Sequence, residues 1–132
     1  MAGDRVLRGV TAALKDTLGS RALLGRYGGE EFSVLLPEAG QEEAFALAER
    51  LRQAAARLEI SLGDTAIKVT ICVGVAATVF EPGAPQHMES NQVCDALIMA
   101  ADSALYRAKQ EGRNKVCAVD FDYGERPAEQ PL

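Results

Sequence analysis

Apolar residues recur every three or four positions in three stretches of the chain, and this spacing predicts three amphipathic helices. We expect these helices at residues 4–18, 41–58 and 93–111. Asp4 is placed to cap the first helix, and Gly19 and Gly112 are placed to end the first and the third. The apolar stripes are Val6, Leu7, Val10, Leu14 and Leu18, then Ala44, Leu47, Ala48, Leu51, Ala55 and Leu58, then Leu97, Ala100, Ala101, Ala104, Leu105 and Ala108.

Short apolar runs between these helices, bounded by turn residues, predict strands. A strand–turn–strand unit centres on Gly28 and Gly29, and further strands are expected at residues 60–62, 66–77 and 115–120, with a loop at 81–92. This order predicts an α+β domain in which helices pack on a mostly antiparallel sheet, in the βαββαβ ferredoxin-like plan. That plan begins with a central strand, whereas this chain begins with a helix.

The 132 residues are enough for one domain, which we expect at residues 1–122, with a polar, proline-containing tail at 123–132. The net charge of −5, with acids and bases interspersed, argues against DNA or RNA as a partner. No apolar run has the length of a membrane span and no secretory signal begins the chain, so we expect a cytoplasmic segment without membrane contact.

Histidine and cysteine offer little chemistry in this chain. His87 is the single histidine and lies in the predicted loop, so it cannot assemble a histidine-based metal site or catalytic triad. The three cysteines match no zinc pattern, and we expect buried free thiols.

The heptapeptide from Arg26 to Phe32 has the sequence Arg-Tyr-Gly-Gly-Glu-Glu-Phe, with an apolar run on each side. The paired glycines permit positive φ angles and let a ligand approach bare backbone. Glu30 and Glu31 follow directly, and carboxylate oxygens suit a hard cation such as Mg²⁺, which commonly accompanies nucleotide phosphates. The alternative is an ordinary polar hairpin tip in which these residues only keep the turn soluble.

Four segments in chain order resemble the GGDEF family of diguanylate cyclases, in the variant with Glu at the third position of the signature. The fold implied is the nucleotidyl-cyclase-like form of the ferredoxin plan. The segments are Gly3-Asp4-Arg5-Val6-Leu7, Arg26 to Phe32, Val69-Thr70-Ile71-Cys72-Val73-Gly74-Val75-Ala76, and Ala101 to Lys109 continued by Gly112-Arg113-Asn114. Cys72 departs from the family, which usually has Ser at that position.

The resemblance implies site roles. Glu30 would bind Mg²⁺, or Mn²⁺ in its place, and Glu31 would support the same metal site or the ribose. The glycines of the turn, Gly28 and Gly29, would admit GTP. Asp4 would recognise the guanine edge, although capping the first helix is an equal alternative for the same carboxylate. The cations that would bind the triphosphate are Lys109 and Arg113. The alternative is that this cation pair only stabilises the negative end of the helix dipole.

By the same resemblance, the activity would be condensation of two GTP into cyclic di-GMP and pyrophosphate, by two GGDEF domains facing each other as a homodimer. The alternative is a degenerate, non-catalytic domain that binds GTP or a partner protein and regulates an attached module. A sensory domain of unknown kind would control the parent protein.

Two departures from the family pattern carry expectations. The family has a strand and a helix before the Gly-Asp-x-Val-Leu segment, with a metal-binding Asp and a guanine-binding Asn. Without them we expect unpaired sheet edges, little cyclase activity from this chain alone, and a partner strand in the sheet, including one exchanged between copies. The family's Arg-x-x-Asp product site corresponds to Gly19-Ser20-Arg21-Ala22, which lacks the Asp, so we expect no product binding there.

Overall fold

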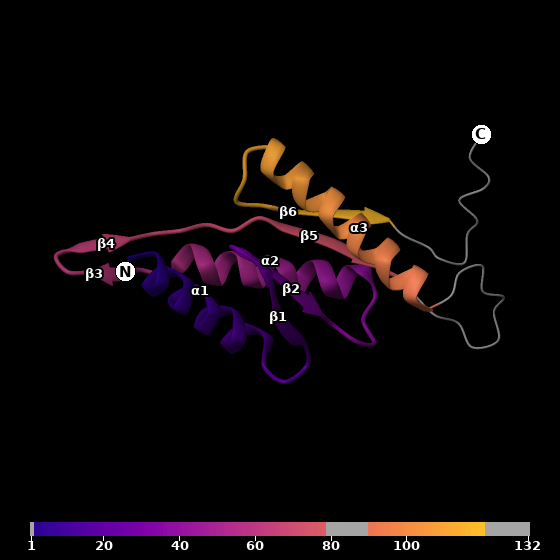
Figure 1. Ribbon diagram of the computed structural model, residues 1–132, viewed down its shortest axis with the longest axis horizontal. Coiled ribbons are helices and arrows are strands. Elements are labelled where there is room, and N and C mark those ends of the chain that lie inside the picture. The colour runs from indigo at the N-terminus through magenta and orange to yellow at the C-terminus, as the bar shows by residue number, and fades with distance from the viewer. Residues whose placement is uncertain (1, 79–89, 121–132) are drawn as a thin grey trace.

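The computed structural model describes residues 2–78 and 90–120, which form three helices and six strands. The elements in order are α1 (Ala2–Leu18), β1 (Leu23–Gly28), β2 (Glu31–Leu35), α2 (Gln41–Arg57), β3 (Ile60–Leu62), β4 (Thr65–Ile67), β5 (Val73–Ala77), α3 (Ser90–Gln110) and β6 (Val116–Asp120) (Figure 1). The three helices, the hairpin and the last strand therefore form where the sequence pattern predicts them.

The starts of two helices differ from the sequence prediction. Helix α1 begins at Ala2, so Asp4 lies inside its first turn and is not the N-cap residue. There the carboxylate still faces the positive end of the helix dipole. Helix α3 begins at Ser90, so the last residues of the predicted loop are helical, and most of that loop lies outside the described residues. The tail predicted at 123–132 also lies outside them.

The predicted strand at 66–77 is divided into β4 and β5. Strand β4 pairs with β3, and β5 pairs with β6, whereas residues 68–72 run between them without a ladder partner. The pattern of apolar residues predicts extended backbone over the whole of residues 66–77. A strand also needs a neighbouring strand with which its backbone N–H and C=O groups form hydrogen bonds. The pairing partners therefore decide where each strand ends.

The α+β class is confirmed, and the sheet is divided into three two-stranded pieces. Strands β1 and β2 are antiparallel, β3 and β4 are antiparallel, and β5 and β6 are parallel. Strands β2 and β5 do not pair with each other. Each therefore keeps one edge without a strand partner in the described part of the chain, as expected for a sheet that lacks its central strand.

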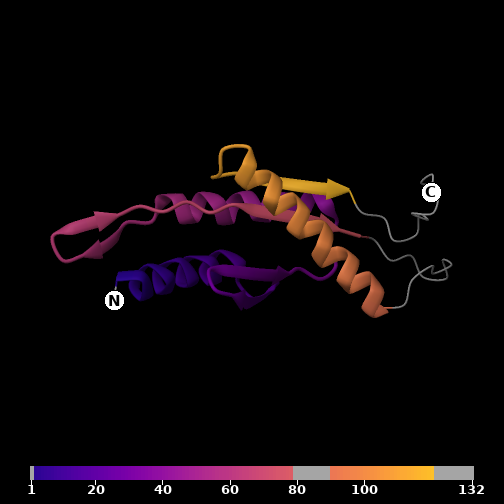
Figure 2. The same ribbon diagram turned by 45° about the horizontal axis from the view of Figure 1, so that its top comes forward.

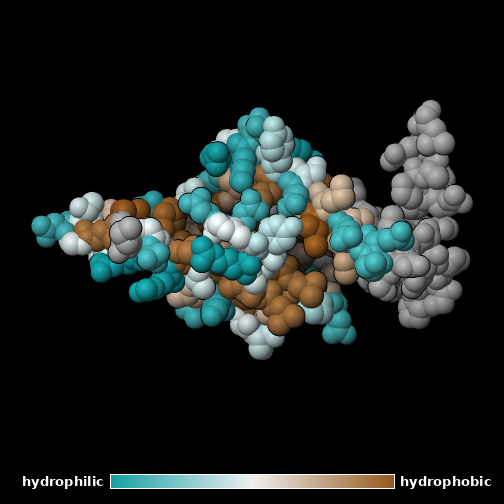
Figure 3. All heavy atoms as spheres, viewed as in Figure 1, coloured by the Kyte–Doolittle hydropathy of each residue, from teal (hydrophilic) through white to brown (hydrophobic). Residues whose placement is uncertain are grey.

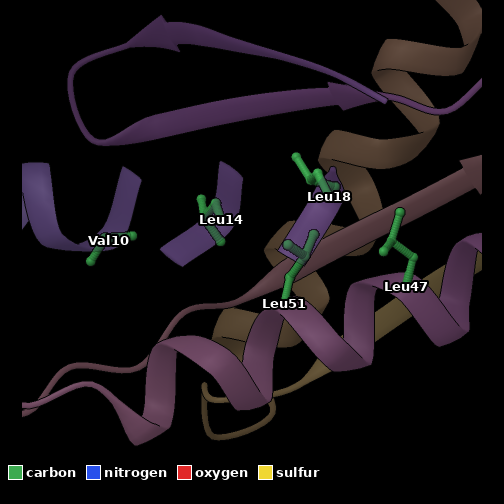
Figure 4. Close-up of a cluster of buried hydrophobic side chains, with 5 residues drawn as sticks. All are labelled: Val10, Leu14, Leu18, Leu47 and Leu51. Atoms are coloured by element: carbon green, nitrogen blue, oxygen red, sulfur yellow. The ribbon is translucent and has the colours of Figure 1, made fainter. Parts of the chain in front are cut away.

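The larger hydrophobic core lies between α1 and α2. Its buried residues are Val10, Leu14 and Leu18 of α1 with Leu47 and Leu51 of α2, each at most 8% exposed (Figure 4). The hairpin packs on this core through Leu24 and Phe32, which are half-buried. Burial of one such aliphatic side chain contributes about 1.5–3 kcal/mol, so this cluster fixes α1, α2 and the hairpin against one another.

Helix α3 packs on β5 and β6 in a second cluster, which contains Ala104, Ala108 and Cys117. Gly74 of β5 lies directly under this helix: a Cβ at this position would stand 2.9 Å from the Cα of Leu105 and closer still to the backbone oxygen of Ala101. The glycine is therefore required by the close approach of helix and strand.

The β3–β4 hairpin extends beyond the body of the molecule, beside the N-terminal end of α1 (Figures 1 and 2). Two contacts connect it to this helix. Arg5 donates a hydrogen bond from Nη1 to the carbonyl oxygen of Ser61 at 3.2 Å, and Ile60 packs closely against Gly9. Within residues 2–78 and 90–120, no helix combines the length and apolar character that a bilayer crossing needs.

Candidate functional site

The hairpin turn has the backbone geometry that its glycines predict. Gly28 has a φ of 152° and Gly29 a φ of 53°, and no heavy atom lies within 4 Å of the place where either Cβ would stand. The turn therefore requires glycine for its conformation and leaves bare backbone open to a ligand. The register shifts between Arg26 and Gly28, which leaves an irregularity beside the turn.

Arg26 holds this turn in place. Its guanidinium donates two hydrogen bonds to the carbonyl oxygen of Gly29, from Nε at 3.0 Å and from Nη2 at 2.7 Å. Arg26 belongs to the heptapeptide motif but had no predicted role. An arginine three residues before the second glycine is long enough to reach the carbonyl oxygen of that glycine. Only the folded hairpin shows that its side chain bends back to make this hydrogen bond.

The two carboxylates of the motif are exposed at the tip of the hairpin. Glu30 lies in the turn, and Glu31 begins β2 opposite Gly28. Neither forms an ion pair with any residue of the described ranges. Two adjacent carboxylates with free oxygens fit a divalent cation that takes its other ligands from phosphate or water. Among the described residues, no cluster of three or more His, Cys, Asp or Glu side chains could hold a metal by itself.

A groove of about 540 Å³ lies between α1 and the hairpin. One of its lining residues, Phe32, directly follows Glu31 in the sequence. Its apolar lining includes Leu7 and Phe32, and its cations are Arg8, Lys15 and Arg26. This volume lies within the usual range for small-ligand sites. Arg8 and Lys15 of α1 were not predicted as site residues, although their spacing of seven residues, with Thr11 between them, places them on one helical face.

Asp4 lies one helical turn before Arg8 on α1 and is exposed. Because it is not the N-cap residue, its side chain is not committed to the helix end in the way that the alternative interpretation required. Its carboxylate remains a candidate for contact with a base edge.

The two candidate phosphate-binding cations lie at the end of α3. Lys109 belongs to the last turn, and Arg113 follows the helix, so Gly112 turns the chain between them as the sequence predicts. The backbone N–H of Arg113 donates to the carbonyl oxygen of Ala108 at 2.9 Å, which is the hydrogen bond of a Schellman helix end. Glycine with a φ of 113° is what this helix end requires at position 112.

Charge pairing distinguishes these two cations from their neighbours. Arg107 and Lys115 each lie 3.9 Å from a carboxylate oxygen of Glu111. Lys109 and Arg113 are exposed and have no carboxylate partner within the described parts of the chain. Their charges are therefore available to an anionic ligand.

The acidic turn and the basic helix end lie on different hydrophobic clusters. The hairpin packs on the core between α1 and α2, whereas α3 packs on β5 and β6, and α2 contacts both of these strands. In residues 2–78 and 90–120, no hydrogen bond or ion pair connects the tip of the hairpin to the end of α3. Strands β2 and β5 belong to separate two-stranded sheets and do not pair with each other.

Other predicted features have mixed outcomes. Cys117 is buried and Cys72 half-buried, but Cys94 is exposed, so the expectation of buried thiols is wrong for that residue. His87 lies outside the described residues. At the position of the family's product site, Arg21 forms an ion pair with Glu43 of α2.

A sequence model of the family described as "Diguanylate cyclase, GGDEF domain" matches residues 1–115. The chain belongs to the GGDEF family. The diguanylate cyclase DgcM of Escherichia coli K12 is 38% identical over 117 residues, which are 89% of this chain and 25% of DgcM. The chain therefore spans about a quarter of that curated relative.

Solved structures of GGDEF proteins have the same fold. Diguanylate cyclase SiaD of Pseudomonas aeruginosa, in complex with its activator SiaC, matches with a TM-score of 0.71 and 35% identity over 89% of this chain and 41% of SiaD. The active GGEEF domain of a diguanylate cyclase from Vibrio cholerae matches with a TM-score of 0.66 and 31% identity over 88% of this chain and 67% of that domain. These matches confirm the family and fold class predicted from the motifs.

Proposed function

We propose that this GGDEF domain belongs to a diguanylate cyclase that condenses two GTP into cyclic di-GMP and pyrophosphate. The observation that carries this proposal is the open glycine turn with its two unpaired carboxylates, in a chain that matches diguanylate cyclases over residues 1–115. A domain that only served as a scaffold would have no physical need for a bare turn, free carboxylates and free cations together.

The carboxylates of Glu30 and Glu31 would hold Mg²⁺, or Mn²⁺ in its place. Such an ion, when bound, neutralises charge on phosphoryl oxygens. Lys109 and Arg113 would bind the triphosphate, one as a point charge and the other as a planar fork. Asp4 would accept hydrogen bonds from the guanine ring N1–H and the exocyclic amine.

In the reaction, the 3′-hydroxyl of each GTP attacks the α-phosphorus of the other and loses its proton. The bond from each α-phosphorus to the oxygen that bridges it to the β-phosphate breaks, and two pyrophosphates leave. Each domain would hold one nucleotide, so two domains would face each other as a homodimer. Holding both reactants in one geometry would supply much of the rate enhancement. Activity would therefore rise with the concentration of the dimer.

A further strand between β2 and β5 would pair with both strands and complete a sheet. Neither β2 (Glu31–Leu35) nor β5 (Val73–Ala77) contains the lysine or proline that commonly protects a sheet edge. Leu23 and Leu35 are cross-strand partners, at 67% and 61% exposed, and apolar side chains gather over this hairpin in Figure 3. We propose that the strand comes from the longer protein or is exchanged between copies.

The test is calorimetric binding of GTP to the 132-residue chain with and without Mg²⁺. Exchange of either Lys109 or Arg113 for Gln is expected to weaken binding about tenfold to a hundredfold, because a charge-assisted hydrogen bond contributes about 1.5–3 kcal/mol. Glu30→Gln is expected to remove the Mg²⁺-dependent part alone. Arg107→Gln, which changes the same charge on the same helix, is the control.

Unchanged GTP affinity in the Lys109→Gln and Arg113→Gln variants would contradict the proposed site. Intact GTP affinity with no cyclic di-GMP formation by the complete protein would favour a regulatory, nucleotide-binding module instead of a cyclase.

A further inference from the structure

A single guanidinium connects α2 to the turn that carries Arg113. Arg52 donates from Nε to Oε1 of Glu49 at 2.9 Å and from Nη2 to Oε2 at 3.1 Å, which is a bidentate ion pair within α2. The remaining nitrogen, Nη1, donates to Oδ1 of Asn114 at 3.1 Å, across 62 residues of sequence. The fixed fork of the guanidinium makes these contacts mutually dependent, because rotation of one nitrogen moves the others.

The turn that receives this hydrogen bond has an unusual backbone. Gly112, Arg113 and Asn114 follow one another with φ angles of 113°, 65° and 48°. Glycine adopts such angles at no steric cost and asparagine tolerates them, but arginine in the left-handed region is disfavoured. Such a conformation persists only where surrounding contacts hold it, and it is often found at functional sites.

Two hydrogen bonds hold this turn on its two sides. The N–H of Arg113 is bound to the carbonyl oxygen of Ala108 in α3, and the side chain of Asn114 is bound to Arg52 of α2. The first contact belongs to the helix end itself. The second is the one that fixes the turn relative to a different element.

We propose that Arg52 is a positioning residue, which holds the turn at Gly112–Asn114 so that Arg113 and Lys109 present their charges together to a polyphosphate. The proposal rests on the function proposed above for these two cations. It adds a contact between α2 and the basic helix end that the motif residues alone do not contain.

The electrostatics support positioning over direct binding. The Glu49 carboxylate compensates the charge of Arg52, and its hydrogen bonds raise the pKa of Arg52. All three of the donating nitrogens are engaged, and the side chain is 21% exposed. Arg52 therefore has little capacity left for phosphate, and its effect on a ligand must pass through Asn114.

The test measures the dissociation constant of inorganic tripolyphosphate by calorimetry on the 132-residue chain. Arg52→Met keeps the aliphatic stem and removes the fork, and Asn114→Gly keeps the left-handed backbone and removes the acceptor. We expect each to weaken binding about threefold to tenfold, and the double variant to be no weaker than the single ones, because both remove the same contact.

The matched control is Arg50→Met, which removes the same charge from an exposed position of α2. If Arg50→Met weakens binding as much as Arg52→Met does, general charge explains the effect and the positioning role is wrong. The role is also wrong if Asn114→Gly leaves the affinity unchanged, which remains measurable even where Arg52→Met fails to fold. By contrast, unchanged affinity in Lys109→Gln and Arg113→Gln contradicts the proposed phosphate site itself.

Discussion

At the residue scale, the packing of α3 on β5 depends on the missing side chain of Gly74. Gly74→Ala would force the helix away from the strand, because the new methyl group meets backbone atoms of α3 that cannot rotate aside. We expect a loss of about 1–3 kcal/mol in the free energy of unfolding, measured by urea denaturation. Gly3→Ala in α1, where no atom lies within 4 Å, should instead raise stability by about 0.5–1 kcal/mol. Equal effects at both positions would show that backbone entropy alone matters.

The Glu49–Arg52 pair predicts a pH dependence at the same scale. The hydrogen bond from Arg52 lowers the pKa of Glu49 below its ordinary value of 4.5. A carboxylate with a lowered pKa stabilises the fold above that ordinary value, and the contribution is lost as the pH falls through the pKa in the folded state.

We therefore expect Glu49→Gln to cost about 0.2–1 kcal/mol at pH 7, because the pair is partly solvent-exposed, and to cost less at pH 3. Urea denaturation of both proteins at the two pH values measures this difference. A difference that stayed constant or grew on acidification would contradict the assignment.

At the scale of single elements, the tip of the β1–β2 hairpin is held by one arginine side chain. The hydrogen bonds from Arg26 to the carbonyl oxygen of Gly29 close the turn from within. Arg26→Met should therefore speed amide hydrogen exchange at residues 29–31 while leaving the exchange of α1 unchanged.

Arg8→Met is the matched control, because Arg8 lines the same groove and makes no hydrogen bond to the turn in the described structure. If Arg26→Met and Arg8→Met speed amide hydrogen exchange at residues 29–31 equally, the hydrogen bonds from Arg26 to Gly29 do not order the turn. The positive charge of the groove would then explain the effect.

At the scale of the whole molecule, the acidic turn and the basic helix end lie on different hydrophobic clusters. The acidic turn and the basic helix end are not connected by any paired strand among the described residues. We expect the 132-residue chain, incubated with GTP and Mg²⁺, to form little or no cyclic di-GMP, because a metal held by two carboxylates is poorly oriented. Product chromatography measures this, and efficient turnover would contradict it.

Local rules predicted much of this domain. The helix positions follow from apolar spacing, the positive φ angles at Gly29 and Gly112 from glycine chemistry, and the family from four ordered motifs. The role of Asp4 as an N-cap was wrong because helix ends depend on flanking backbone as well as on one residue. The roles of Glu30, Glu31, Lys109 and Arg113 stay predictions.

The sequence by itself determined the elements, the turn that exposes two carboxylates and the cations at a helix end, since each depends on residues a few positions apart. Only the tertiary structure shows which strands pair and that Arg52 reaches Asn114. It also shows that position 74 has no room for a side chain, because α3 lies directly over it. These features depend on backbone segments that meet across long stretches of sequence. Such meetings are set by the packing of whole elements, which no local pattern contains.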